Sequence, residues 1–161
     1  MSLIDVSLSF WDLNRTRTLA KLDEIEKLSD PRAVLGWRPG PGRAHIAWQL
    51  MHIGITEELF ATERLLGTVA AYPDLAPRFK GGSVPDDDIP APDRIRDVLE
   101  ASRSHLRQTM STFNDDDLST IPPAFRERGL TISQILHILT WHEPHHQGQA
   151  HLTLNLWKAR T

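Results

Sequence analysis

The chain has 161 residues and a formal net charge of −3 at pH 7, with 40% hydrophobic and 24% charged residues. Its length fits one domain, 1–161, that buries roughly 70% of its unfolded surface, and its scattered lysines and arginines disfavour nucleic-acid binding. It has no cysteine, which excludes disulfides, thiolate nucleophiles, iron–sulfur clusters and cysteine-type zinc sites.

The N-terminal stretch MSLIDVSLSFWDLNRTR carries Asp5 and Asp12 and has no basic region at its start. These features argue against a secretory signal peptide. No apolar run in the sequence approaches the roughly 18 residues that a membrane-spanning helix needs. We therefore expect a cytoplasmic protein that does not associate with membranes.

Hydrophobic spacing predicts four long helices, over about residues 3–28, 44–66, 92–113 and 131–157. Pro31 and the segment GWRPGPGR are expected to end the first helix. Pro92 suits the first turn of the third helix, because a first-turn residue needs no intrahelical N–H bond. Thr131 followed by Gln134 is a capping-box pattern for the start of the fourth helix.

No strand-like alternation competes with these helices, so we predict an all-α fold in the form of a four-helix bundle. Residues 67–90 join the second and third helices, and this connection is too long for a tight antiparallel hairpin. We therefore expect a long crossover that leaves these two helices roughly parallel. The crossover can be a plain connector or one wall of a pocket, and the sequence leaves both readings open.

Four of the eight histidines crowd into residues 142–151 of the predicted fourth helix. Successive residues of an α-helix are rotated by about 100°, so residues four apart share a face. His142 and His146 accordingly continue the buried stripe formed by Ile132, Ile135 and Leu139. Two of the four histidines are therefore expected to point into the core.

The other histidines are expected to lie elsewhere. His145 is rotated about 60° from His142, His137 about 140°, and His151 lies on the opposite face. His45 lies near the start of the second helix and is interpreted as an end-of-helix residue. His105, alone on the third helix, is interpreted as a surface or rim residue.

His52 lies on the apolar stripe of the second helix, between Trp48 and Ile55. A neutral imidazole in an apolar core costs roughly a few kcal/mol unless its nitrogens find partners. Three inward histidines from two facing helices can bind one divalent ion, and a tetrahedral site then keeps one position open. The alternative is a metal-free bundle whose histidines hydrogen-bond to one another and whose stability does not respond to chelators.

The segments WQLMHIGITEELF and HEPHHQGQAHL together resemble the DinB/YfiT-like superfamily of metal-binding four-helix bundles. The distinctive part is a lone histidine in helix two, followed much later by His-x-x-x-His and Gly-Gln. The resemblance implies a divalent cation between helices two and four, held by His52, His142 and His146. The chain departs from the family pattern at Gln147, where arginine is frequent, and at Pro144, which is expected to kink the helix between the two ligands.

Such an ion, with Zn and Ni as first candidates, can activate water, polarise a carbonyl or bind a thiol. The superfamily includes enzymes that use low-molecular-weight thiols as cosubstrates, beside many members with no assigned reaction, so the resemblance implies a small-molecule substrate and a thiol S-transferase-like enzyme. The alternatives are a metal-dependent hydrolase and a non-catalytic metal-binding stress-response bundle. Thr56 and Gln149, each about one turn beyond a predicted ligand, are candidates for supporting contacts. The resemblance and the five tryptophans, among them Trp141 and Trp157, also predict a homodimer.

Overall fold

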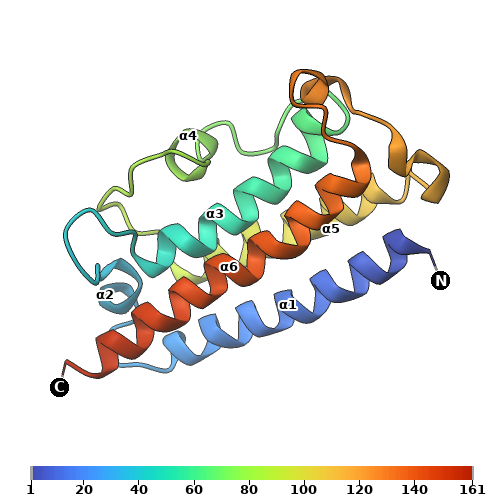
Figure 1. The fold of residues 1–161 in the computed structure, drawn as a ribbon. Helices are drawn as coiled ribbons and strands as arrows, with labels where there is room; N and C mark the ends of the chain where they lie inside the picture. The colour runs from blue at the N-terminus through green and yellow to red at the C-terminus, as the bar shows by residue number, and fades with distance from the viewer. Residues whose placement is uncertain (1, 161) are drawn as a thin grey trace.

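The computed structural model describes residues 2–160 and shows four long helices lying side by side (Figure 1). These helices are α1 (Leu3–Glu26), α3 (Ile46–Leu59), α5 (Pro92–Met110) and α6 (Ile132–Lys158). The connections contain two short helices, α2 (Pro31–Gly36) and α4 (Ala76–Phe79), and two 3-10 segments, η2 (Asp115–Ser119) and η3 (Pro123–Arg128). No strand forms between residues 2 and 160, which confirms the predicted all-α class. Nor does any helix in that range combine the length and apolar character that a membrane crossing requires.

The helix starts follow the capping signals in the sequence. The Thr131 hydroxyl accepts a hydrogen bond from the Gln134 backbone N–H, and the Gln134 side chain accepts one from the Thr131 backbone N–H, as the capping box predicts. Pro92 occupies the first turn of α5. Pro31 does not only end the first helix, because it also begins the short helix α2, with Asp30 as its N-cap.

The second long helix changes character near its end. α3 ends at Leu59, and the next residues form the π turn η1 (Phe60–Arg64), in which the Leu65 N–H donates to the Phe60 carbonyl at 3.2 Å. Residues four apart in an α-helix advance about 40° past a full turn, and the wider π turn reduces this advance. Arg64 therefore stays on the same face of the helix as His52.

The contacts between helices give their directions. Between α3 and α5, Glu57 binds Arg103 and the Thr109 hydroxyl donates to the Ala61 carbonyl. The residue numbers therefore increase in the same direction along the two helices, which are parallel. The contacts between α1 and α6 show in the same way that these helices are parallel, whereas those between α3 and α6 show that these two are antiparallel. Residues 67–90 therefore return the chain from the end of α3 to the start of a parallel α5.

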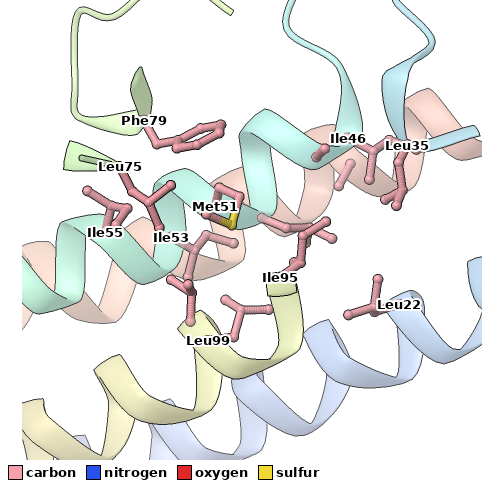
Figure 2. Close-up of a cluster of buried hydrophobic side chains, with 14 of the residues drawn as sticks. Leu22, Leu35, Ile46, Met51, Ile53, Ile55, Leu75, Phe79, Ile95 and Leu99 are labelled. Carbon is pink, nitrogen blue, oxygen red and sulfur yellow. The ribbon is translucent and has the colours of Figure 1, made fainter. Parts of the chain in front are cut away.

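α3 is the central helix, because it packs against α5, α6, α2 and α4 and is buried on nearly every face. Gly54 allows α5 to approach closely, since a Cβ at this position would lie 2.9 Å from Val98 Cγ1. Figure 2 shows the hydrophobic core around α3, which contains Leu22, Leu35, Ile46, Met51, Ile53, Ile55, Leu75, Phe79, Ile95 and Leu99. This packing holds the inward side chains of α3 in place.

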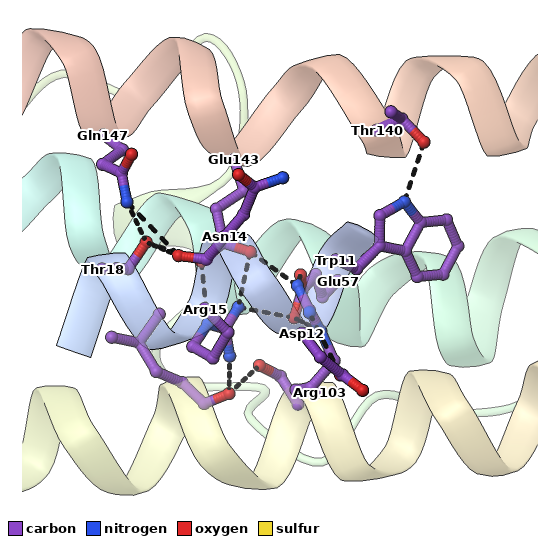
Figure 3. Close-up of polar contacts among 12 residues, drawn as sticks. Trp11, Asp12, Asn14, Arg15, Thr18, Glu57, Arg103, Thr140, Glu143 and Gln147 are labelled. Carbon is purple, nitrogen blue, oxygen red and sulfur yellow. Dashed lines mark hydrogen bonds and ion pairs between the residues drawn. The ribbon is translucent and has the colours of Figure 1, made fainter. Parts of the chain in front are cut away.

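A cluster of four charged side chains, one from each long helix, lies inside the fold (Figure 3). It consists of Arg15, Glu57, Arg103 and Glu143, whose side chains are at most 7% exposed. Arg15 contacts Glu57 at 2.9 Å and Glu143 at 2.8 Å, while Arg103 contacts Glu143 at 2.6 Å and also binds Glu57. The two positive and two negative charges cancel, which makes burial of this four-charge cluster tolerable.

Candidate metal centre

The structure brings the three predicted ligand residues together. His52 comes from α3, and His142 and His146 come from successive turns of α6. One ligand-capable atom from each of the three lies within 4.8 Å of the others. The three side chains that the sequence analysis singled out therefore lie close together between the two helices.

His52 is held by its neighbours on two sides. Its Nδ1 lies 2.6 Å from the Phe79 carbonyl oxygen, which can only accept, so Nδ1 carries the proton and donates. The imidazole also stacks on Trp48, with ring centroids 4.6 Å apart and an interplanar angle of 9°. These contacts leave the Nε2 lone pair of His52 directed away from the crossover and towards α6.

The Nε2 atoms of His52 and His142 lie 3.1 Å apart. Two nitrogens bound to one tetrahedral zinc at 2.0–2.1 Å are about 3.3 Å apart, so this distance suits two ligands of one ion. It also suits a hydrogen bond in which His142 Nε2 donates to His52 Nε2. The distance alone therefore fits both the metal-bound and the metal-free interpretations of the sequence.

A relay of amides orients the third histidine. His146 Nδ1 donates to the Gln49 side-chain oxygen at 2.6 Å, and the Gln49 amide donates to Gln149 Oε1 at 2.9 Å. The Gln149 amide in turn lies 2.7 Å from Nε2 of His145 and donates to it. Because Nδ1 of His146 carries the proton, its Nε2 keeps a lone pair for a ligand bond. Gln149 thus supports the site through Gln49, and His145 ends the relay.

The three imidazoles are neutral at physiological pH. Burial is the main cause, and it lowers the pKa of His142 and of His146 to about 3. Repulsion between the clustered histidines lowers both pKa values further. Burial also lowers the pKa of His52, against the hydrogen bond to Phe79, which raises it. A neutral imidazole is the form that binds a metal ion, so no protons must leave before binding.

A cavity of about 390 Å³ opens beside the three histidines, and His52 and His142 form part of its wall. Thr56, one turn after His52 on α3, also lines it, as do Gly81 from the crossover and residues of η1 and η3. The crossover therefore contributes a wall as well as a connection. Among the described residues that line this cavity, none is acidic.

Residues adjacent to the ligands in sequence point elsewhere. Glu143 follows His142 directly, yet its carboxylate lies in the four-charge cluster and also accepts from the Thr18 hydroxyl at 2.7 Å. Gln147, at the position where the resemblance expects arginine, donates to the Thr18 hydroxyl at 3.2 Å. α6 continues as one helix through Pro144. The ligand-bearing turn therefore has polar support from α1 on its far side.

The remaining histidines lie outside the three-histidine group. His45 caps α3, where its Nδ1 accepts from the Trp48 backbone N–H at 3.0 Å. His105, on α5, contacts Glu58 of α3 at 2.9 Å. His151 is exposed and bonds to Asn155 on its own helix.

Comparison with known proteins relates the chain to a family. The family description "DinB superfamily" matches residues 11–150, which is most of the chain and includes all three histidines. No curated protein and no solved structure matches the chain.

Proposed function

Since the chain belongs to the DinB superfamily, we propose that it is a divalent-metal-binding four-helix-bundle protein whose ligands are His52, His142 and His146. The observation that carries this proposal is the orientation of the three imidazoles. Two of them donate their Nδ1 protons to fixed oxygens, which directs the Nε2 lone pairs into one space. Three nitrogen ligands leave a tetrahedral ion one further position.

We further propose that the protein is an enzyme that transfers a thiol to a small electrophile. The family resemblance suggests this reaction class, and the cavity beside His52 and His142 supports it by giving a small molecule access to the site. A divalent ion at this position supplies Lewis acidity, which lowers the pKa of a thiol or a water molecule. The chain's own contribution is to orient the ligands.

The surroundings of the cavity favour thiol transfer over hydrolysis. Hydrolases commonly use a carboxylate to remove a proton from water, and no acidic side chain among the described residues lines this cavity. The nearest acid in sequence, Glu143, is bound to Arg15, Arg103 and Thr18. A thiol needs less help, since its ordinary pKa of about 8.5 is already close to neutrality.

The first test is metal content, measured by mass spectrometry on tag-free protein. We expect about one divalent ion per chain, Zn or Ni, and loss of the ion in the three ligand variants His52→Ala, His142→Ala and His146→Ala. His151→Ala is the matched control, because this exposed histidine lies on the same helix as two ligands. Failure of the wild-type chain to take up either metal after incubation would favour the hydrogen-bonded, metal-free interpretation.

The second test separates a thiol-handling site from a purely structural one. Protein reconstituted with Co²⁺ should change its visible spectrum when 2-mercaptoethanol is added, because a thiol that reaches an open position changes the coordination. A spectrum that is unchanged by thiols, with one tightly held ion per chain, would favour the non-catalytic metal-binding bundle.

We also propose that two copies pair through the outer face of α1. Leu3, Val6, Phe10 and Leu13 recur at helical spacing on this face and are 41–49% exposed. Trp141, on the neighbouring helix α6, is 60% exposed. Trp157, in contrast, packs within the chain against Trp37, with ring centroids 6.0 Å apart. Analytical ultracentrifugation should show a dimer that Phe10→Glu converts to a monomer, and a monomeric wild-type chain would refute the pairing.

A further inference from the structure

The cavity beside the three histidines carries positive charge on the part of its wall that η1 and η3 form. Arg64, the last residue of η1, and Arg128, the last residue of η3, both line it together with His52 and His142. The whole chain has a net charge of −3, so this pair is a local exception to an acidic protein.

Aromatic contacts hold Arg64, and the segment η3 that carries Arg128, at the cavity. The Phe60 and Phe125 rings stack with centroids 5.8 Å apart and an interplanar angle of 19°, which joins η3 to η1. The Arg64 guanidinium lies over the Phe60 ring, 4.5 Å from its centroid. The π turn of η1 keeps Arg64 on the face of His52, so both segments contribute to placing the pair.

Neither arginine is neutralised by the protein within residues 2–160. Arg64 is partly buried and Arg128 is exposed, and no ion pair joins either guanidinium to a carboxylate there, whereas the buried Arg15 contacts two carboxylates and Arg103 three. The pKa of Arg64 is lowered, mainly by burial and also by repulsion from Arg128, although the neighbouring carboxylate of Glu63 acts in the opposite direction.

The partly buried Arg64 and the exposed Arg128 line the same cavity and repel each other, and an anion between the two guanidinium groups would relieve this repulsion. Guanidinium groups bind carboxylate and phosphate oxygens with particular strength, because their planar N–H groups match the oxygen geometry. The Thr56 hydroxyl, on the wall between Arg64 and His52, adds one more donor.

We infer that this cavity binds a small acidic molecule, whose carboxylate or phosphate group contacts Arg64 and Arg128 while its other end reaches His52 and His142. The cavity volume of about 390 Å³ lies in the usual range for small-molecule sites. The inference rests on the proposed function for the role of the reacting end, and it names the substrate class as anionic. The anion contact itself does not require a metal.

The test is calorimetric titration of EDTA-treated protein with inorganic phosphate and, separately, with succinate, at pH 7.5 and constant ionic strength. We expect at least one anion to bind, with an affinity that falls about tenfold or more in Arg64→Gln and in Arg128→Gln and is lost in the double variant. Arg17→Gln combined with Arg126→Gln is the control, because it removes the same charge from exposed positions outside the cavity. Circular dichroism shows which variants are folded, and the single variants suffice if the double variant is not.

Whichever anion binds identifies the group that the arginines recognise. Failure of both anions to bind the wild-type chain, or equal binding to the wild type and to both single variants, would overturn the inference. Because this titration uses metal-free protein, its outcome is independent of the metal measurement. A chain that binds an anion but no metal would refute the proposed function and leave the anion site standing.

Discussion

Arg15 is the side chain whose loss should disturb the interior of the fold most. It contacts Glu57 at 2.9 Å and Glu143 at 2.8 Å, and its side chain is 6% exposed. In Arg15→Met, two buried carboxylates would share the single guanidinium of Arg103, which leaves one negative charge uncompensated. Removing one partner of a buried ion pair costs about 3–5 kcal/mol, a large part of the roughly 5–15 kcal/mol that stabilises a typical domain.

Urea unfolding followed by circular dichroism measures this loss. With a slope of about 2 kcal/mol per molar urea, the midpoint of Arg15→Met should fall by about 2 M. EDTA in every sample keeps metal binding out of the comparison. Arg17→Met is the control, because Arg17 is exposed on the same helix and its replacement should change stability by less than about 0.5 kcal/mol.

A loss below about 1 kcal/mol would refute the reasoning, because it would mean that water reaches the cluster and screens its charges. The double variant Arg15→Met with Glu143→Gln provides a second check. It removes one charge of each sign, so it should be more stable than Arg15→Met alone. A double variant that is less stable by the sum of both single losses would also contradict the charge-balance argument.

Three further outcomes follow from the packing and the site. Gly54→Ala should cost about 1–3 kcal/mol, because its Cβ would lie 2.9 Å from Val98 Cγ1, and an unchanged urea midpoint would contradict the close approach of α5. In the folded chain the pKa values of His142 and His146 lie near 3, against an ordinary value of 6.5, so the unfolded chain binds more protons between these limits. The unfolding free energy of EDTA-treated protein should therefore fall as the pH drops below 6.5, by at most about 1.4 kcal/mol per pH unit for each of the two histidines. Equal urea midpoints at pH 7.5 and 5.5 would argue against buried neutral imidazoles. Gln49→Ala should weaken Zn²⁺ binding about 10–100-fold, because His146 Nδ1 loses its acceptor. Competition with a chromophoric chelator measures the affinity, and an unaltered value would contradict this role of Gln49.

The four long helices could be predicted from the sequence because each carries apolar side chains at helical spacing. The helical rotation also sufficed to separate His142 and His146 from His145 and His151, since helix geometry alone decides which of them face inward. His52 was predicted for a related reason, as a polar side chain on an apolar stripe must find a partner. The family resemblance added the prediction that this partner is a divalent ion.

The features that were not predicted depend on contacts between distant parts of the chain. The sequence gives no sign that Arg15, Glu57, Arg103 and Glu143 meet, because isolated charged residues on helices are ordinarily solvated. The two short helices have four and six residues, too few to show a hydrophobic period. The π turn at 60–64 continues the apolar pattern of α3 and so looked like more of the same helix.

The hydrogen bond from His52 to Phe79 bears on how this protein can vary among its relatives. The acceptor is a main-chain oxygen, so any residue at position 79 can supply it, and the Phe79 ring is constrained only by its own burial at 1% exposure. An insertion or deletion in the crossover would instead move the oxygen away from the imidazole. Length between the end of α3 and Phe79, rather than residue identity, is therefore the quantity that selection on this contact would preserve.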